Sequence, residues 1–208
     1  MEQEIENISD SKAIRGRRSR QIKAILAGGL VLGVGAAITL AAWNDSEFAQ
    51  GTFSAGTFNL VGSTDGTTFA EHAAVGTPAT LAFTVSPTQL SPGDIVYAPF
   101  AVELDSSTTN DAVVTVSNAA TSGVISNLSY ELIQPTAFGC ASGTTGTELV
   151  AAGTALGSVP ASTTFTLSKG TPPTTAGAPA FLCFKVTAGA LTQGQTGTAT
   201  IEFAAVSQ

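Results

Sequence analysis

Histidine is almost missing from this sequence of 208 residues, since His72 is the only one. A catalytic zinc site usually takes about three protein ligands, and the His-Glu-x-x-His spacing of zinc peptidases does not occur. Serine hydrolysis needs a base beside the nucleophile, and no Gly-x-Ser-x-Gly motif accompanies the many serines. We therefore expect no zinc peptidase and no serine hydrolase, and interpret His72 as a surface loop residue.

Acidic side chains offer two further candidate sites. Glu103 and Asp105 lie two residues apart on an expected strand, so they share a face and could act on a glycoside, or simply be solvated. Asp65, Asp105 and Asp111 lie near expected loops and could bind calcium, but no loop with ligand spacing supports that hypothesis. We interpret these carboxylates as solubility charges, and expect no enzyme activity, no metal and no cofactor.

Positive charge is scarce beyond residue 42. Only Lys169 and Lys185 follow that point, against eleven Asp and Glu residues, so residues 43–208 carry a net charge of −9. Phosphate binding needs clustered cations, so we expect this region to repel nucleic acid. The remaining basic residues all lie before residue 24: Lys12, Arg15, Arg17, Arg18, Arg20 and Lys23.

The basic cluster precedes an apolar run without charge, residues 24–42. A basic n-region (1–23), an apolar h-region (24–42) and small residues at its end are typical of a secretory signal helix. The run is also long enough to span a bilayer as a retained anchor. Both readings place residues 43–208 outside the cytoplasm, because the basic flank stays inside.

The expected cleavage site lies between Ala42 and Trp43. Leu40, three positions before the cut, is larger than signal peptidases prefer, which favours a specialised peptidase. Apolar residues do not follow Arg17 and Arg18 directly, so we expect the Sec route and not the twin-arginine route. The predicted location is extracellular or at the cell surface, with membrane contact through residues 1–42 only.

Cysteine occurs twice, at Cys140 and Cys183, both in the region expected outside the cell. An oxidising compartment favours a disulfide between them, and the alternative is two buried free thiols. The bridge would close a loop of about 43 residues and contribute roughly 4 kcal/mol.

Apolar residues recur at every second position in many short runs of residues 43–208. Such alternation predicts strands with one face turned to a core. Polar turns separate the runs, including Thr64–Thr67, Ser91–Asp94 and the loops 142–146 and 171–177. We predict one all-β domain, an antiparallel β-sandwich of jelly-roll type. The apolar positions are Leu81, Phe83, Val85; Val96, Ala98, Phe100, Val102, Leu104; Leu128, Tyr130, Leu132; Phe165, Leu167; Leu182, Phe184, Val186; and Ala199, Ile201, Phe203.

Residues 40–60 read LAAWNDSEFAQGTFSAGTFNL. This junction resembles the TasA/camelysin family of exported proteins, in which a SipW-type signal peptidase cuts after Ala-Ala and a Thr-Phe-x-Ala-Gly-Thr stretch follows. Pro92, Gly93 and Asp94 resemble a second element of the family, the turn before the next strand. The long basic N-terminus and the cysteine pair are more similar to the actinobacterial branch.

The resemblance implies a jelly-roll domain and a role in surface fibres or biofilm matrix. Fibres of the family form when the mature N-terminus completes the sheet of the next subunit, which assigns the donor strand here to Trp43, Asn44, Asp45, Phe48 and Phe53. Trp43, Phe48 and Phe53 are five apart and cannot share one face of a regular strand, so a bulge near Gly51 or a groove contacting both faces is required. The alternative is a first strand folded onto its own domain.

The sequence therefore supports three functional hypotheses. The first is a secreted structural subunit that self-associates into filaments, with the signal peptidase as its partner during export. The second is a monomeric exported module that binds cell-wall or matrix components. The third, a camelysin-like protease, has the least support because the required histidines are missing.

Overall fold

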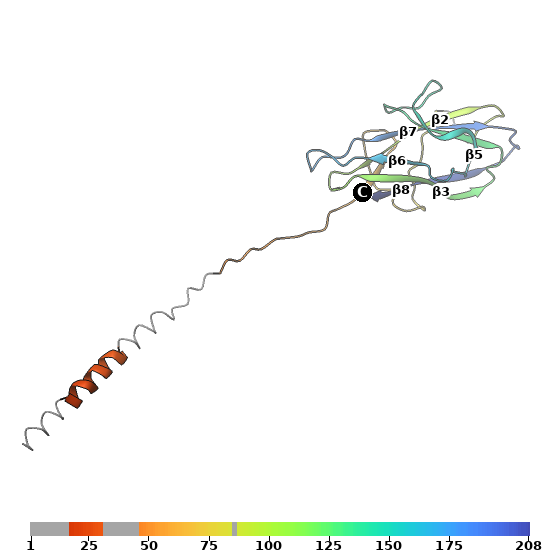
Figure 1. Ribbon diagram of the computed structural model, residues 1–208. Helices are drawn as coiled ribbons and strands as arrows, with labels where there is room; N and C mark the ends of the chain where they lie inside the picture. Colours follow the sequence, from red (N-terminus) through yellow and green to blue (C-terminus); the bar gives the residue numbers. More distant parts are fainter. Residues whose placement is uncertain (1–16, 31–45, 85–86) are drawn as a thin grey trace, which may run out of the picture. The chain divides into compact units, whose positions relative to one another are not determined.

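The computed structural model describes residues 17–30, 46–84 and 87–208 (Figure 1). The chain divides into two units, Met1–Phe53 and Ser54–Gln208. In the first unit, residues 17–30 form an exposed helix, which covers the end of the predicted n-region and the start of the h-region. No helix among the described residues is long and apolar enough to cross a membrane. Residues 31–42 of the predicted h-region lie outside the described residues.

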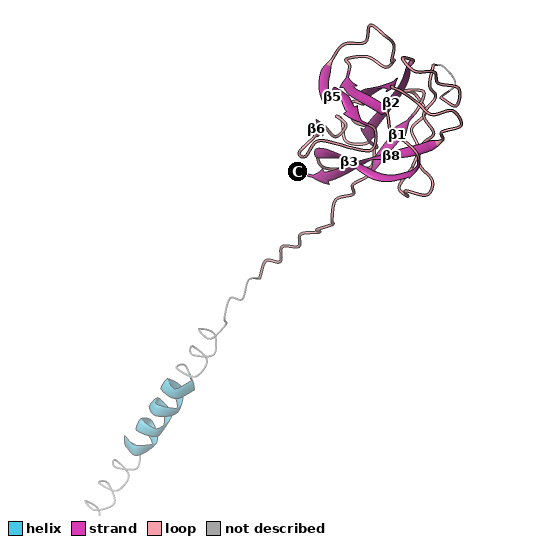
Figure 2. Ribbon diagram, turned by 90° about the vertical axis from the view of Figure 1, so that its right-hand side faces the viewer, coloured by secondary structure: helices cyan, strands magenta, loops and turns pink. Residues whose placement is uncertain are grey.

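The second unit contains two antiparallel sheets, and the prediction of an all-β sandwich is confirmed (Figures 1 and 2). The five-stranded sheet has the order β1-β2-β7-β4-β5, and the three-stranded sheet has the order β6-β3-β8. The strands are β1 Leu60–Ser63, β2 Ile95–Leu104, β3 Ala112–Gly123, β4 Leu128–Gln134, β5 Thr147–Ala155, β6 Thr164–Leu167, β7 Ala180–Ala188 and β8 Gly197–Ser207.

The core lies between the two sheets, and the predicted alternation places the right side chains in it. On β2, every second residue from Val96 to Leu104 is buried, because successive side chains of a strand point to opposite faces. Tyr130 and Leu132 of β4 are buried in the same layer. The predicted runs at 96–104, 128–132, 165–167, 182–186 and 199–203 all fall within strands.

One predicted strand, over residues 81–86, is wrong. Residues 81–84 form no strand, and residues 85–86 lie outside the described residues. The Thr84 N–H donates to the Tyr97 carbonyl of β2 at 2.9 Å, and the Tyr97 N–H donates to the Thr84 hydroxyl at 3.3 Å. Pro99, two residues along β2, has no N–H to offer, which prevents a longer ladder beside it.

Two predicted turns are confirmed in detail. The Asp65 carboxylate accepts hydrogen bonds from the N–H groups of Thr67 and Thr68, at 2.8 and 2.7 Å. Gly93 has φ of +93°, and the Asp94 N–H donates to the Ser91 carbonyl at 3.0 Å, as a type II turn requires. The first turn directly follows β1, and the second directly precedes β2.

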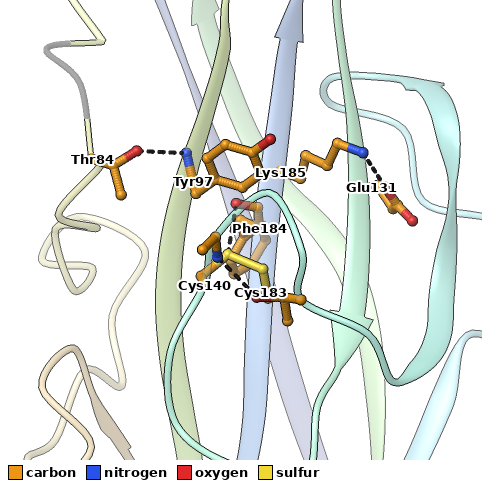
Figure 3. The surroundings of a disulfide bond; sticks show 9 residues. Thr84, Tyr97, Glu131, Cys140, Cys183, Phe184 and Lys185 are labelled. Atoms are coloured by element: carbon orange, nitrogen blue, oxygen red, sulfur yellow. Dashed lines mark hydrogen bonds and ion pairs between the residues drawn. A yellow bond between two sulfur atoms is a disulfide. The ribbon is translucent and has the colours of Figure 1, made fainter.

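Cys140 and Cys183 form the predicted disulfide, with 5.0 Å between their Cα atoms (Figure 3). Cys183 belongs to the central strand β7, so the bridge ties the loop after β4 to the middle of the five-stranded sheet. Phe138 of that loop packs on Phe181, with ring centroids 6.0 Å apart. Figure 3 also shows the ion pair between Lys185 and Glu131, 3.2 Å long, beside the bridge.

Candidate functional site

The expected donor segment is only partly described. Trp43, Asn44 and Asp45, together with the cleavage residue Ala42, lie outside the described residues. Residues 46–53, here called the arm, have no regular secondary structure, and every side chain is exposed. Phe48 and Phe53 are 96% and 95% exposed. The two exposed phenylalanine side chains therefore form an apolar surface on the first unit that no other described segment covers.

The chain after the arm is fixed to the domain by main-chain hydrogen bonds. The N–H of Thr109 donates to the Thr57 carbonyl at 3.0 Å, and the N–H of Asp105 donates to the Asn59 carbonyl at 3.1 Å. The Asn59 N–H in turn donates to the hydroxyl of Thr108 at 2.9 Å. Residues 56–59, here called the anchor, are thus held by the loop 105–110 that joins β2 to β3.

Gly56 shows why the anchor has its sequence. A Cβ atom at this position would collide with the hydroxyl of Thr109, so a larger residue would force the Thr109 side chain to move. The stretch Ala-Gly-Thr-Phe-Asn-Leu, which carries the family resemblance, therefore builds this anchor and the start of β1. The loop 105–110 leads to Asp111, whose carbonyl accepts the N–H of Gln208. The anchor thus lies at the end of the sandwich where β8 ends.

Asn59 also organises the carboxylates around the anchor. Its amide donates to Glu71 at 2.6 Å and to Asp105 at 2.7 Å. Hydrogen bonds from Ser107, and from Asn59, lower the pKa of Asp105. Partial burial, with a smaller contribution from Asp105, raises the pKa of Glu103. Glu71 and Asp105 both accept hydrogen bonds from the Asn59 amide. We therefore interpret these two carboxylates as structural groups that hold the anchor in place.

The three aspartates considered for calcium lie in different loops. Asp65 caps its own turn, Asp105 caps the loop before β3, and Asp111 accepts the Lys169 N–H at 2.9 Å. Local hydrogen bonds, chiefly from the Thr68 N–H, lower the pKa of Asp65. Within the described part of the chain, no three His, Cys, Asp or Glu side chains are close enough to hold a metal ion. His72 is exposed, in the loop between β1 and β2.

A groove of about 470 Å³ lies at one end of the sandwich. Leu90, Leu128 and Leu191 contribute apolar side chains to its lining, and Gln193 and Gln195 each contribute an amide. The Gln195 amide is already engaged, because it donates to the carbonyls of Val124 and Ser126 at 3.1 and 2.9 Å. Gln195 therefore shapes the wall of the groove and does not orient a polar ligand.

Comparisons with protein-family models and with curated proteins give no match for this chain. The arm, the anchor and the sheet edges must therefore be interpreted from their own geometry and chemistry.

Proposed function

We propose that this protein is an exported structural subunit of cell-surface fibres or biofilm matrix. In this proposal residues 1–42 are a signal segment that a SipW-type peptidase removes between Ala42 and Trp43. The exported domain is a jelly-roll-like sandwich, and residues 43–53 act as a donor strand that adds to a neighbouring subunit. Assembly takes place outside the cytoplasm and involves neither nucleic acid nor a cofactor.

The observation that carries this proposal is the state of the arm. Phe48 and Phe53 are almost fully exposed and lie on a segment without sheet partners. Nearly all of their apolar surface is therefore in contact with water. An added strand obtains main-chain hydrogen bonds from a sheet edge and buries alternate side chains. Addition of the arm to a neighbouring sheet would therefore supply its missing sheet partner and remove its phenylalanines from water. Because donor and acceptor are different surfaces, the contact is head-to-tail and extends into a filament when the rotation does not close.

The first test uses residues 43–208, the predicted mature chain. Size-exclusion light scattering over a concentration series, with electron micrographs of the same fractions, is expected to show species of high mass that are regular filaments. Deletion of residues 43–53 is expected to leave a folded monomer, because Ser54–Gln208 contains all the described strands and the disulfide. A Gln50→Ser variant, which keeps both phenylalanines, should still assemble.

A monomer at every concentration would contradict the structural proposal. It would favour the second candidate, a monomeric surface module that binds a cell-wall or matrix component. The observation that supports this candidate is the groove lined by Leu90, Leu128 and Leu191 together with polar side chains. In that case Leu191→Asp is expected to abolish retention on cell-wall material and leave the fold unchanged, as judged by circular dichroism.

A further inference from the structure

The sandwich has four sheet edges, and three of them are protected. β1 is covered, because Gly62 and Ala70 exchange two main-chain hydrogen bonds of 3.0 and 2.9 Å. β5 is bent by two register shifts against β4 and by Gly153, which has φ of +84°. β6 has only four residues. Short, bulged or covered edges are the usual means by which sheets avoid pairing with other chains.

The fourth edge, β8, is neither short nor covered by another described segment, and the one register shift of its ladder, at Asn118/Ala120, places the extra residue on β3 and leaves β8 regular. It has eleven residues, no proline and a single charged side chain, Glu202. Among the described strands it pairs with β3 alone. An exposed edge of this length is a template for another strand.

The hydrogen bonds at its two ends show which residues face the open side. The Val124 N–H donates to the Thr196 carbonyl, and the Gln208 N–H donates to the Asp111 carbonyl. In an antiparallel ladder the bonded pairs alternate with unbonded ones, so the even-numbered residues of β8 bond to β3. The odd-numbered residues, 197 to 207, therefore direct their N–H and C=O groups to the open side.

The core face of β8 is apolar near this edge, whereas its outer face is mixed. On the core side, Ile201, Phe203 and Ala205 are half-buried. The Phe203 ring lies 5.7 Å from that of Phe100, measured between centroids, so it joins the two sheets. The outer face carries Thr198, Thr200 and Glu202, followed by Ala204 and Val206, and Val206 is 61% exposed. A strand added here would bury apolar surface along its core face and, near Ala204 and Val206, on its outer face.

We infer that the open edge of β8 is the acceptor, and that residues 43–53 of a second copy of this chain occupy it. This inference rests on the proposed function and identifies its binding surface. The donor has eleven residues, as β8 has, and Glu47 is the one charged residue of its arm. Phe48 and Phe53 point to opposite faces of a regular strand, so one would pack on the apolar core face of β8 and the other on its outer face near Ala204 and Val206.

The acceptor can be tested without filaments, because Ser54–Gln208 contains the whole sandwich. A peptide of residues 43–56 is added to this domain. Trp43 is the only tryptophan of the chain, so its emission reports binding directly. Hydrogen–deuterium exchange by mass spectrometry then locates the peptide. We expect exchange in residues 197–207 to slow at least tenfold, with β5 and β6 unchanged.

Matched variants separate side-chain burial from main-chain pairing. Phe48→Ser and Phe53→Ser peptides are each expected to bind about tenfold more weakly or worse, and Gln50→Ser within about twofold of the parent. Ala199→Pro in the domain removes one open-side N–H, keeps the bonds to β3 and should weaken binding. Ala199→Ser keeps that N–H and should bind as the parent does.

The outcomes distinguish this inference from the proposed function. No binding, or slowed exchange at an edge other than β8, overturns the assignment of the acceptor. If residues 43–208 form filaments in which exchange of β8 is unchanged, the acceptor is wrong and the structural function stands. If the peptide slows exchange at β8 but residues 43–208 stay monomeric, the acceptor stands and the filament function fails.

Discussion

Tyr130 combines a buried ring with a hydroxyl that has one protein partner. Its side chain is almost fully buried, and its hydroxyl donates to the Ser158 carbonyl at 2.8 Å. Burial raises the pKa of Tyr130 to about 12. The hydroxyl therefore links β4 to the loop after β5 only while it keeps its proton.

We expect Tyr130→Phe to lower the free energy of unfolding at pH 7 by about 1 kcal/mol, because the Ser158 carbonyl loses its donor. The parent should also lose stability as pH rises from about 10 to 12, because the unfolded chain then releases the phenolic proton and the folded chain retains it. Urea titrations at several pH values measure both effects. Equal alkaline loss in parent and variant would contradict the assignment to Tyr130.

At the scale of elements, the disulfide has the clearest energetic role. It joins Cys140, in the loop after β4, to the buried Cys183 of β7, across 43 residues of sequence. A cross-link of this span restricts the unfolded chain, which raises the free energy of unfolding. The bridge also holds Phe138 near Phe181 on the same sheet.

A Cys140→Ser, Cys183→Ala variant is expected to fold and to lose about 2–4 kcal/mol of stability. Reduction of the parent should cause a loss of similar size, measured by urea denaturation with and without reductant. The variant serves as the control, because reductant should leave its midpoint unchanged. A parent whose midpoint does not respond to reduction would contradict this role.

The strands differ in how well the sequence predicts them, and the reason is composition. Strict alternation of large apolar residues identified β2, β4, β6, β7 and β8. β5 contains Gly153 and β3 ends in NAATSG, and such small or polar residues give no alternating pattern. The run at 81–86 has the pattern, but in its described part, residues 81–84, pairing with β2 stops at Thr84. A strand forms only where an edge can pair with it along several residues. Propensity could not reveal that Pro99 blocks this edge.

The candidate site was predicted less completely than the fold. The sequence pointed to the N-terminal segment through its resemblance and its phenylalanines. It gave no sign that Asn59 would fasten the anchor to Asp105, because those residues are 46 positions apart. The open edge of β8 was equally hidden, since an edge is defined by strand order and not by the strand's own sequence.

At the scale of the whole molecule, net charge opposes the assembly that the arm favours. Residues 43–208 carry −9, so two copies repel one another. Glu47 of the arm and Glu202 of β8 add a like-charged pair at the inferred joint. The range of this repulsion falls from about 30 Å at 0.01 M salt to about 10 Å at 0.1 M salt.

We therefore expect the rate of filament growth, measured by light scattering, to increase several-fold between 0.01 and 0.15 M salt. Glu47→Gln should accelerate growth at low salt and reduce the dependence on salt. Glu148→Gln makes the same change of net charge on β5, away from the inferred joint, and is the matched control. If both variants respond equally, net charge alone controls the rate, whereas a larger response of Glu47→Gln places repulsion at the joint. Slower growth at high salt would instead mean that attraction between opposite charges drives assembly, contrary to the apolar joint inferred here.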